Sequence, residues 1–155
     1  SFGLWGLSGG VWYRVKEYYY ASRSTGVQLT DQEYAAELTR LASQHRIRCV
    51  VADPSAASFI TALRQAGYRV IKADNDVLSG IRITADLLKR GRIVICDTCE
   101  DCLREIALYR WSEETSGRDA PHKDNDHAMD DMRYFAVTMA VREDSEGVFC
   151  SVARG

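Results

Sequence analysis

The stretch that most constrains the fold is IRCVVADPSAASFITALRQAGYRVIKA, residues 47–73. It opens with a short apolar run, continues with an amphipathic helical pattern over 56–67, and closes with a second β-prone run. A strand, a helix and a strand in this succession predict two parallel strands joined by a right-handed crossover. The expected class is therefore α/β, with helices packed on a sheet.

The rest of the chain extends this unit into a mixed sheet. Two aromatic-rich runs flank Ser8-Gly9-Gly10, which is typical of an antiparallel hairpin. The spacing of Thr30 and Glu33 predicts a capping box at the start of the next helix. The expected elements are strands at 2–7, 11–20, 47–52, 68–73 and 92–96, helices at 29–45, 56–67, 76–91, 98–111 and 126–142, and a polar loop at 112–126. We predict an antiparallel hairpin followed by parallel strands, flanked by helices.

Composition excludes several classes of protein. The 155 residues, 46% of them hydrophobic and 27% charged, are typical of one globular domain. No run of about 18 apolar residues occurs, and the apolar start lacks a basic segment, so we expect no membrane partner, no signal peptide and a cytoplasmic location. No G-x-x-x-x-G-K-[ST] motif is present. With a formal net charge of −2, contact with DNA would need local basic patches.

Asp53 directly follows the apolar run at 47–52, at the carboxyl end of a predicted parallel strand. Ligands collect at this edge in open α/β sheets. Because Pro54 comes next, Asp53 could equally be the N-cap of the following helix, which needs no function. Its position alone leaves both interpretations open.

Asp130 belongs to the acidic segment HKDNDHAMDDMRYFA, residues 122–136. On a helix, it shares a stripe with Tyr134, Val137 and Val141. Because this stripe is apolar, Asp130 should point to the interior or its rim. An ionised carboxylate there needs a partner or a metal ion.

The other acids of this segment have simpler interpretations. Asp124 fits a loop residue, and Asp126 fits the N-cap of the helix. Asp131 would add a favourable first-turn charge. His127, by contrast, falls on a row adjacent to that of Asp130.

Asp53, His127 and Asp130 are the predicted metal ligands, with the two acids as the catalytic residues. Mg²⁺ or Mn²⁺ accepts carboxylate oxygens, and Mn²⁺ also accepts imidazole. Two such ions about 3.5–4 Å apart would activate water and stabilise the leaving oxygen in phosphodiester cleavage. Three protein ligands are few for two metal ions, so at least one further carboxylate is expected.

Three of the five cysteines form a C-x-x-C-x-x-C pattern: Cys96, Cys99 and Cys102. This pattern can hold a metal, but a closed zinc site needs four ligands, and the other two cysteines have no paired spacing. Asp97 and Glu100 have capping-box spacing, so we favour a helix start with Cys99 and Cys102 as small apolar residues. A cysteine-based zinc module remains the alternative, which elemental analysis would test.

Residues 50–83, VVADPSAASFITALRQAGYRVIKADNDVLSGIRI, and 109–136, YRWSEETSGRDAPHKDNDHAMDDMRYFA, resemble the C-terminal nuclease domain of large terminase subunits from tailed phages and prophages. The DPSA turn and the D-H-x-x-D-x-x-R-Y helix are the most specific parts. The resemblance implies a ribonuclease H-like fold and cutting of concatemeric phage DNA with two divalent metals. It matches Asp53 and Asp130 to family acids and His127 to the family histidine.

The same resemblance implies a further catalytic aspartate on a strand upstream of Phe2 and a packaging ATPase domain before it. We therefore expect residues 1–155 to be a single nuclease domain without its first strand, with weakened metal binding and little cleavage. A plasmid-nicking comparison with a version extended upstream tests this expectation. The implied partners are double-stranded DNA, the portal and the small terminase subunit, in a bacterial host cell.

Basic residues are the candidates for contact with DNA phosphates: Lys72, Arg82, Lys89, Arg90, Arg92 and Lys123. The first five are expected around one end of the parallel strands. Lys123 and Arg118 lie in the predicted loop before the metal helix. Such residues would position phosphates without reading sequence, although each one alone is equally well explained as a solvated charge.

Two other functions fit the same pattern. One is another ribonuclease H-like nuclease, such as a resolvase or transposase core. The sequence of residues 116–135 argues against this alternative. The other is a non-catalytic DNA-packaging module that docks portal or small terminase subunits. Asp53→Ala or Asp130→Ala would separate enzyme from docking module, because only the enzyme loses cleavage while it stays folded.

Overall fold

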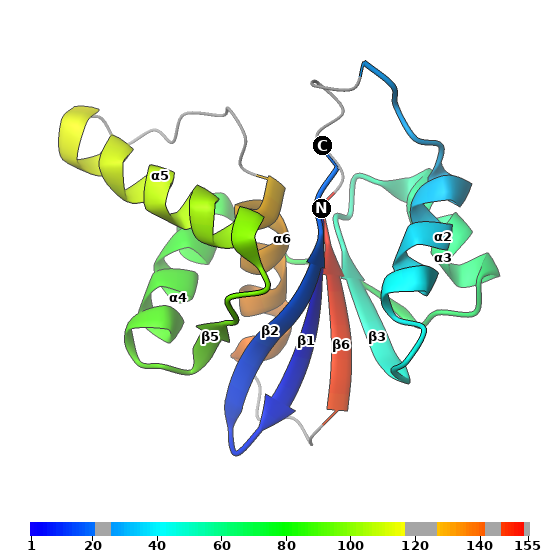
Figure 1. Ribbon diagram of the computed structural model, residues 1–155, viewed down its shortest axis with the longest axis horizontal. Helices are drawn as coiled ribbons and strands as arrows, with labels where there is room; N and C mark the ends of the chain where they lie inside the picture. Colours follow the sequence, from blue (N-terminus) through cyan, green and yellow to red (C-terminus); the bar gives the residue numbers. More distant parts are fainter. Residues whose placement is uncertain (21–25, 117–126, 142–146, 154–155) are drawn as a thin grey trace.

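The computed structural model describes residues 1–20, 26–116, 127–141 and 147–153, and is built on one six-stranded mixed sheet. The strands are β1 (Phe2–Ser8), β2 (Val11–Tyr18), β3 (Ile47–Ala52), β4 (Val70–Lys72), β5 (Ile93–Ile95) and β6 (Gly147–Val152), in the spatial order β4-β3-β6-β1-β2-β5. Strand β1 is antiparallel to both of its neighbours, whereas β3–β4, β3–β6 and β2–β5 are parallel pairs (Figure 1). The predicted α/β class and mixed sheet are confirmed.

Helices cover both faces of this sheet. They are α2 (Asp31–Leu41), α3 (Ala57–Gln65), α4 (Val77–Lys89), α5 (Glu100–Ser116) and α6 (His127–Phe135), which continues as the π-helical turn η1 (Ala136–Ala140). Helices α2 and α3 lie on one side of the strands, and α4, α5 and α6 on the other (Figure 1). The predicted capping box forms at α2, where Thr30 and Glu33 bond reciprocally. No helix of the described part is long and apolar enough to cross a membrane.

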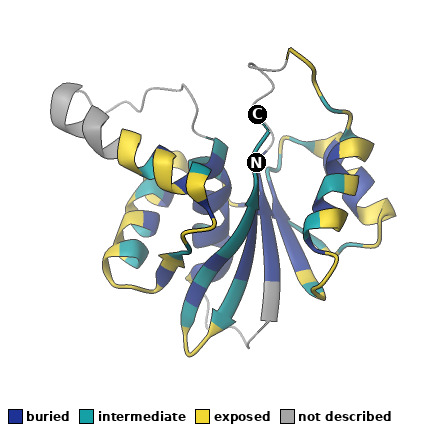
Figure 2. Ribbon diagram, in the orientation of Figure 1, coloured by how far each residue is buried: buried dark blue, intermediate teal, exposed yellow. Residues whose placement is uncertain are grey.

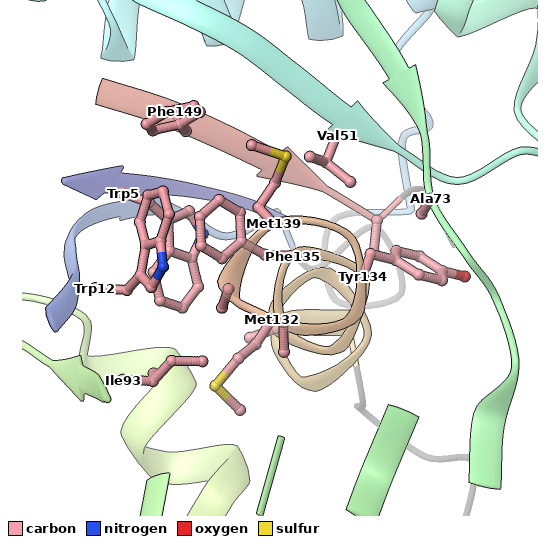
Figure 3. Packing of buried hydrophobic residues seen from close by; sticks show 14 of the residues in the cluster. Trp5, Trp12, Val51, Ala73, Ile93, Met132, Tyr134, Phe135, Met139 and Phe149 are labelled. Atoms are coloured by element: carbon pink, nitrogen blue, oxygen red, sulfur yellow. The ribbon is translucent and has the colours of Figure 1, made fainter. Parts of the chain in front are cut away.

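The alternation of side chains along the strands divides the core in two. Val50 and Ala52 pack with α2 and α3, whereas Val51 between them packs with α6. On the α6 side, the Trp5 and Phe135 rings stack with centroids 4.3 Å apart. Figure 2 shows burial concentrated in the sheet and in the inner sides of the helices, and Figure 3 shows this aromatic cluster around α6. Helix α6 is thereby fixed against the middle of the sheet.

One strand was not predicted, and the predicted start of the polar loop was wrong. Residues 147–152 were given no strand, yet β6 lies between β1 and β3 and bonds to both. The run GVFCSV is short and interrupted by serine, so only its two neighbouring strands stabilise it as sheet. The polar loop was expected from residue 112, but α5 continues to Ser116. The remainder of that predicted loop, 117–126, lies outside the described residues.

Candidate functional site

Asp53 lies at the carboxyl end of β3, as predicted, and its carboxylate bonds in two directions. Oδ1 accepts hydrogen bonds from the backbone N and the hydroxyl of Ser55, both at 2.8 Å. Oδ2 accepts one from the Tyr134 hydroxyl at 3.2 Å. Helix α3 begins at Ala57 with Ala56 as its N-cap, so the alternative of Asp53 as a helix cap is wrong. The residue is half-buried in a turn that faces α6.

Asp130 lies in the first turn of α6, at the rim of the core. Its side chain is 36% exposed, and its Oδ1 accepts a hydrogen bond at 2.8 Å from Nη2 of Arg133. The stripe on which it was predicted runs from buried Tyr134 through half-buried Val137 to exposed Val141. Asp130 therefore has both a protein partner and access to solvent.

Tyr134 connects the two predicted catalytic acids. It is 6% exposed and lies at the margin of the aromatic cluster, with its hydroxyl directed away from Trp5 and Trp12 (Figure 3). Burial raises the pKa of Tyr134 to about 12, and the negative charges of Asp130 and Asp53 add to this effect. Tyr134 bonds to Asp53 and lies one helical turn after Asp130, so α6 brings Asp130 toward the carboxyl end of β3.

Arg133 is the cation of this edge. Its guanidinium lies 4.7 Å from the centroid of the Tyr134 ring, in addition to its bond with Asp130. Burial alone would lower the pKa of Arg133, but the neighbouring Asp130 reverses the effect, so that the pKa is raised. The arginine thus stays charged beside the two acids.

His127 is the first residue of α6 and is half-buried. Its ring lies 6.3 Å from that of Tyr19, tilted by 50°. In the part of the chain that the structure describes, no three His, Cys, Asp or Glu side chains gather closely enough to hold a metal ion. The structure therefore brings Asp53 and Asp130 together through Tyr134, and the ligand role of His127 stays a prediction.

The donor chemistry of the two acids nevertheless suits a hard divalent cation. Mg²⁺ keeps several waters and is commonly bound by one or two carboxylates together with substrate phosphates. Asp53 and Asp130 supply two partly exposed carboxylates on different elements of the fold. They fit an ion that is shared with a phosphate, not an ion enclosed by protein alone.

The prediction that Asp131 is a first-turn charge was wrong, because Asp131 belongs to the buried core. It is fully buried and forms an ion pair with Arg14 of β2, which is also fully buried. It further accepts hydrogen bonds from the hydroxyls of Ser1 at 2.5 Å and Ser151 at 3.0 Å. Burial would lower the pKa of Arg14, but the charge and hydrogen bond of Asp131, together with Cys102 and Glu17, raise it overall. Asp131 therefore anchors α6 to the sheet.

Two glutamates that were not predicted as structural residues cap the N-termini of helices. Glu17 of β2 accepts the backbone N–H of Asp101 at 2.7 Å, in the first turn of α5. Glu105 of α5 accepts those of Ala128 at 2.9 Å and Met129 at 3.0 Å, in the first turn of α6. Burial raises the pKa of both glutamates. Because these caps are tertiary contacts, no local spacing could have indicated them.

Two cysteines of the C-x-x-C-x-x-C pattern pack as core residues, whereas Cys96 is half-buried. Cys99 and Cys102 are fully buried in the cluster around α6, as predicted, and the Cys99 thiol donates to the backbone oxygen of Arg14 at 3.4 Å. Burial raises the pKa of Cys99 to about 11 and that of Cys102 to about 12. The predicted capping box at Asp97 was wrong, because α5 begins only at Glu100 and its first turn bonds to Glu17.

The basic residues do not gather at one end of the sheet. Lys72 ends β4 opposite Ala52 and so lies near Asp53. Helix α4 then runs 13 residues, or about 20 Å, to the opposite edge and carries Arg82 in its middle. There Arg92 donates to the carbonyl oxygen of Gly10 in the β1–β2 turn at 2.9 Å. Lys89 and Arg90 end the same helix.

The expected grouping of these five residues was therefore wrong. Only Lys72 lies at the Asp53 edge, and Arg90 is paired with Asp86 at 2.9 Å on the far side. Residues 118 and 123, predicted to contact DNA from the loop, lie outside the described residues, as do Asp124 and Asp126. A role in DNA binding stays a prediction for each.

A mixed α/β domain with one acid after β3 and another in the first turn of α6, both next to Tyr134, is the class that these observations define. Solved structures similar to this domain are those of the large terminase from a thermophilic bacteriophage, in complex with ADP, in complex with ATP-gamma-S and in another crystal form. Each is 47% identical over 88% of this chain, with a TM-score of 0.79. The chain spans 35–36% of the length of those terminases. No protein-family model and no curated protein matches it.

Proposed function

We propose that this chain is the nuclease domain of a DNA-packaging large terminase, with a ribonuclease H-like fold. The observation that carries the proposal is the contact between Tyr134 and Asp53, beside Asp130, at the carboxyl edge of the sheet. The similarity to the large terminase of the thermophilic phage supports it. The proposed reaction is metal-dependent cleavage of concatemeric phage DNA in the cytoplasm of the bacterial host.

The protein groups have separate tasks in this proposal. Asp53 is held by the Ser55 turn and by Tyr134, so this carboxylate is oriented before a ligand arrives. These two acids would hold the metal ions, with His127 as a further ligand at the helix start. Mg²⁺ or Mn²⁺ would supply Lewis acidity and an activated water. The bonds from Ser55 and Tyr134 keep the Asp53 carboxylate in place.

The proposed partners follow from the same function. Double-stranded DNA is the proposed substrate. Lys72 lies close enough to the Asp53 edge to contact the phosphate backbone of the DNA. The portal and the small terminase subunit would bind the full-length protein. A non-catalytic docking module is the rival function, and it would tolerate loss of either acid.

Plasmid cleavage by the full-length protein tests the proposal. Supercoiled DNA is incubated with Mg²⁺, Mn²⁺ or a chelator, and nicked and linear products are counted over time. Asp53→Asn and Asp130→Asn should each abolish metal-dependent cleavage while the melting temperature stays within a few degrees of wild type. Asp86→Asn is the matched control, because Asp86 is an exposed acid at the far end of α4. Full cleavage by either site variant would support the docking module instead.

A further inference from the structure

Arg133 places a buried positive charge beside Asp130, on the side of α6 that packs against α4. Its side chain is 8% exposed, one nitrogen bonds to Asp130 and the guanidinium covers the ring of Tyr134. Tyr134 in turn bonds to Asp53. Two consecutive helix residues therefore bind the two carboxylates and also stack on each other.

The fold leaves space for this arginine at one glycine of α4. A Cβ atom at Gly80 would lie 2.6 Å from Cγ and 2.8 Å from Cδ of Arg133, closer than such atoms approach. Helix α4 thus passes directly over the aliphatic part of the arginine. This close contact keeps the guanidinium at the acidic edge and away from solvent.

The stability of the fold does not by itself explain why a charged residue occupies position 133. Nη1 of Arg133 is buried and has no hydrogen-bond partner among the described residues, which is costly for a cationic group. By comparison, Arg14 bonds to Asp131 through two nitrogens and also to Glu17. An apolar side chain of similar length at position 133 would often be equally stable or more stable. The charge itself therefore needs a role.

We propose that Arg133 is an internal counter-cation of the site, which neutralises Asp130 and competes with a divalent metal ion for that carboxylate. The inference rests on the proposed function, because it assumes that Asp53 and Asp130 bind the ion. A guanidinium beside the binding position repels an incoming cation and holds one carboxylate oxygen. Arg133 thereby sets the metal concentration at which the site fills. While the site holds no metal ion, the positive charge of Arg133 also reduces the repulsion between the two acids.

Mn²⁺ binding to the full-length protein, followed by electron paramagnetic resonance of the free ion, tests this role without cleavage. Mn²⁺ binding is assigned to the proposed site when the Asp53→Asn substitution abolishes it. Arg133→Met, which keeps the length of the side chain, should bind Mn²⁺ about tenfold more tightly at this site, and Arg133→Lys should stay near wild type. Arg40→Met is the matched control, because Arg40 forms an exposed i,i+3 pair with Glu37 on α2.

The outcomes separate the two proposals. Equal or weaker Mn²⁺ binding by folded Arg133→Met overturns the counter-cation, even if Asp53→Asn abolishes binding. If neither wild type nor Arg133→Met shows binding that depends on Asp53, the proposed metal site itself is overturned. Should Arg133→Met fail to fold, Arg133→Gln supplies the same comparison, with tighter binding expected again.

Discussion

The hydroxyl of Tyr134 donates a hydrogen bond to Oδ2 of Asp53 at 3.2 Å, across 81 positions of the chain. Because Tyr134 belongs to α6 and Asp53 follows β3, this bond ties the last described helix to the carboxyl edge of the sheet. The pKa of Tyr134, raised to about 12, keeps the phenol protonated at neutral pH. It can therefore donate to the carboxylate at neutral pH.

Tyr134→Phe should weaken cleavage more than stability. The variant keeps the ring in the core and removes only the bond that orients Asp53, so cleavage should fall about 10-fold or more, as for other groups that orient metal ligands. The free energy of unfolding should change by about 1 kcal/mol. Tyr68→Phe, which removes a hydroxyl bonded to Thr39 on the opposite face, should leave cleavage unchanged. Wild-type cleavage by Tyr134→Phe would show that Asp53 needs no such support.

Asp131→Ala should be strongly destabilising, because it leaves the charge of Arg14 buried without its main partner. We expect a loss of about 3–5 kcal/mol in the free energy of unfolding, measured by urea denaturation. Adding Arg14→Met should recover much of that loss, since no buried charge then remains. Glu37→Ala, which breaks an exposed ion pair, should cost at most about 0.5 kcal/mol. Additive losses for Asp131→Ala and Arg14→Met would contradict the buried pair.

Much of the fold could be predicted because its signals are local. The glycine turn between β1 and β2, the Thr30–Glu33 capping box and the crossover after 47–52 all depend on neighbouring residues. Strand β6 could not be predicted in the same way, because two strands distant in sequence form its ladders. Its apolar content alone does not distinguish it from a loop.

The site was predictable in part for the same reason. Asp53 and Asp130 follow from a strand end and a helix stripe, which are one-dimensional patterns. The interior position of Asp131 was missed because it depends on Arg14, 117 positions away. One signal was available: Arg14 lies two residues after Trp12 on β2 and so shares its interior face, where a cation needs an acid.

Glu105→Gln should change how stability depends on pH. Burial raises the pKa of Glu105 above its ordinary 4.5, so the folded protein holds this proton more tightly than the unfolded chain does. Wild-type stability should therefore fall as pH rises from 4.5 through the raised pKa, and the glutamine variant should lack this fall. Thermal unfolding of both proteins between about pH 4 and 8 gives the difference, with exposed Glu37→Gln as control. Parallel curves for wild type and Glu105→Gln would refute the effect.

The buried cysteines should resist thiol reagents. With pKa values of about 11 and 12, Cys99 and Cys102 carry almost no thiolate at about pH 8, whereas Cys96 is only half-buried. Ellman's reagent should therefore label Cys96 first in the folded protein and all five thiols after denaturation. Mass spectrometry of the labelled peptides identifies the site. Rapid native labelling of Cys102, or zinc in elemental analysis, would favour the cysteine-based metal module.

The central claim is that Asp53 and Asp130 together bind the metal ion used in DNA cleavage. Anomalous diffraction from crystals of the full-length protein soaked in Mn²⁺, at a concentration that supports plasmid cleavage, tests it most directly. The account predicts an anomalous peak within coordination distance of both carboxylates, about 2.0–2.3 Å from their oxygens, and its loss in Asp53→Asn. A peak elsewhere in this domain, with none at the two acids, would contradict the account.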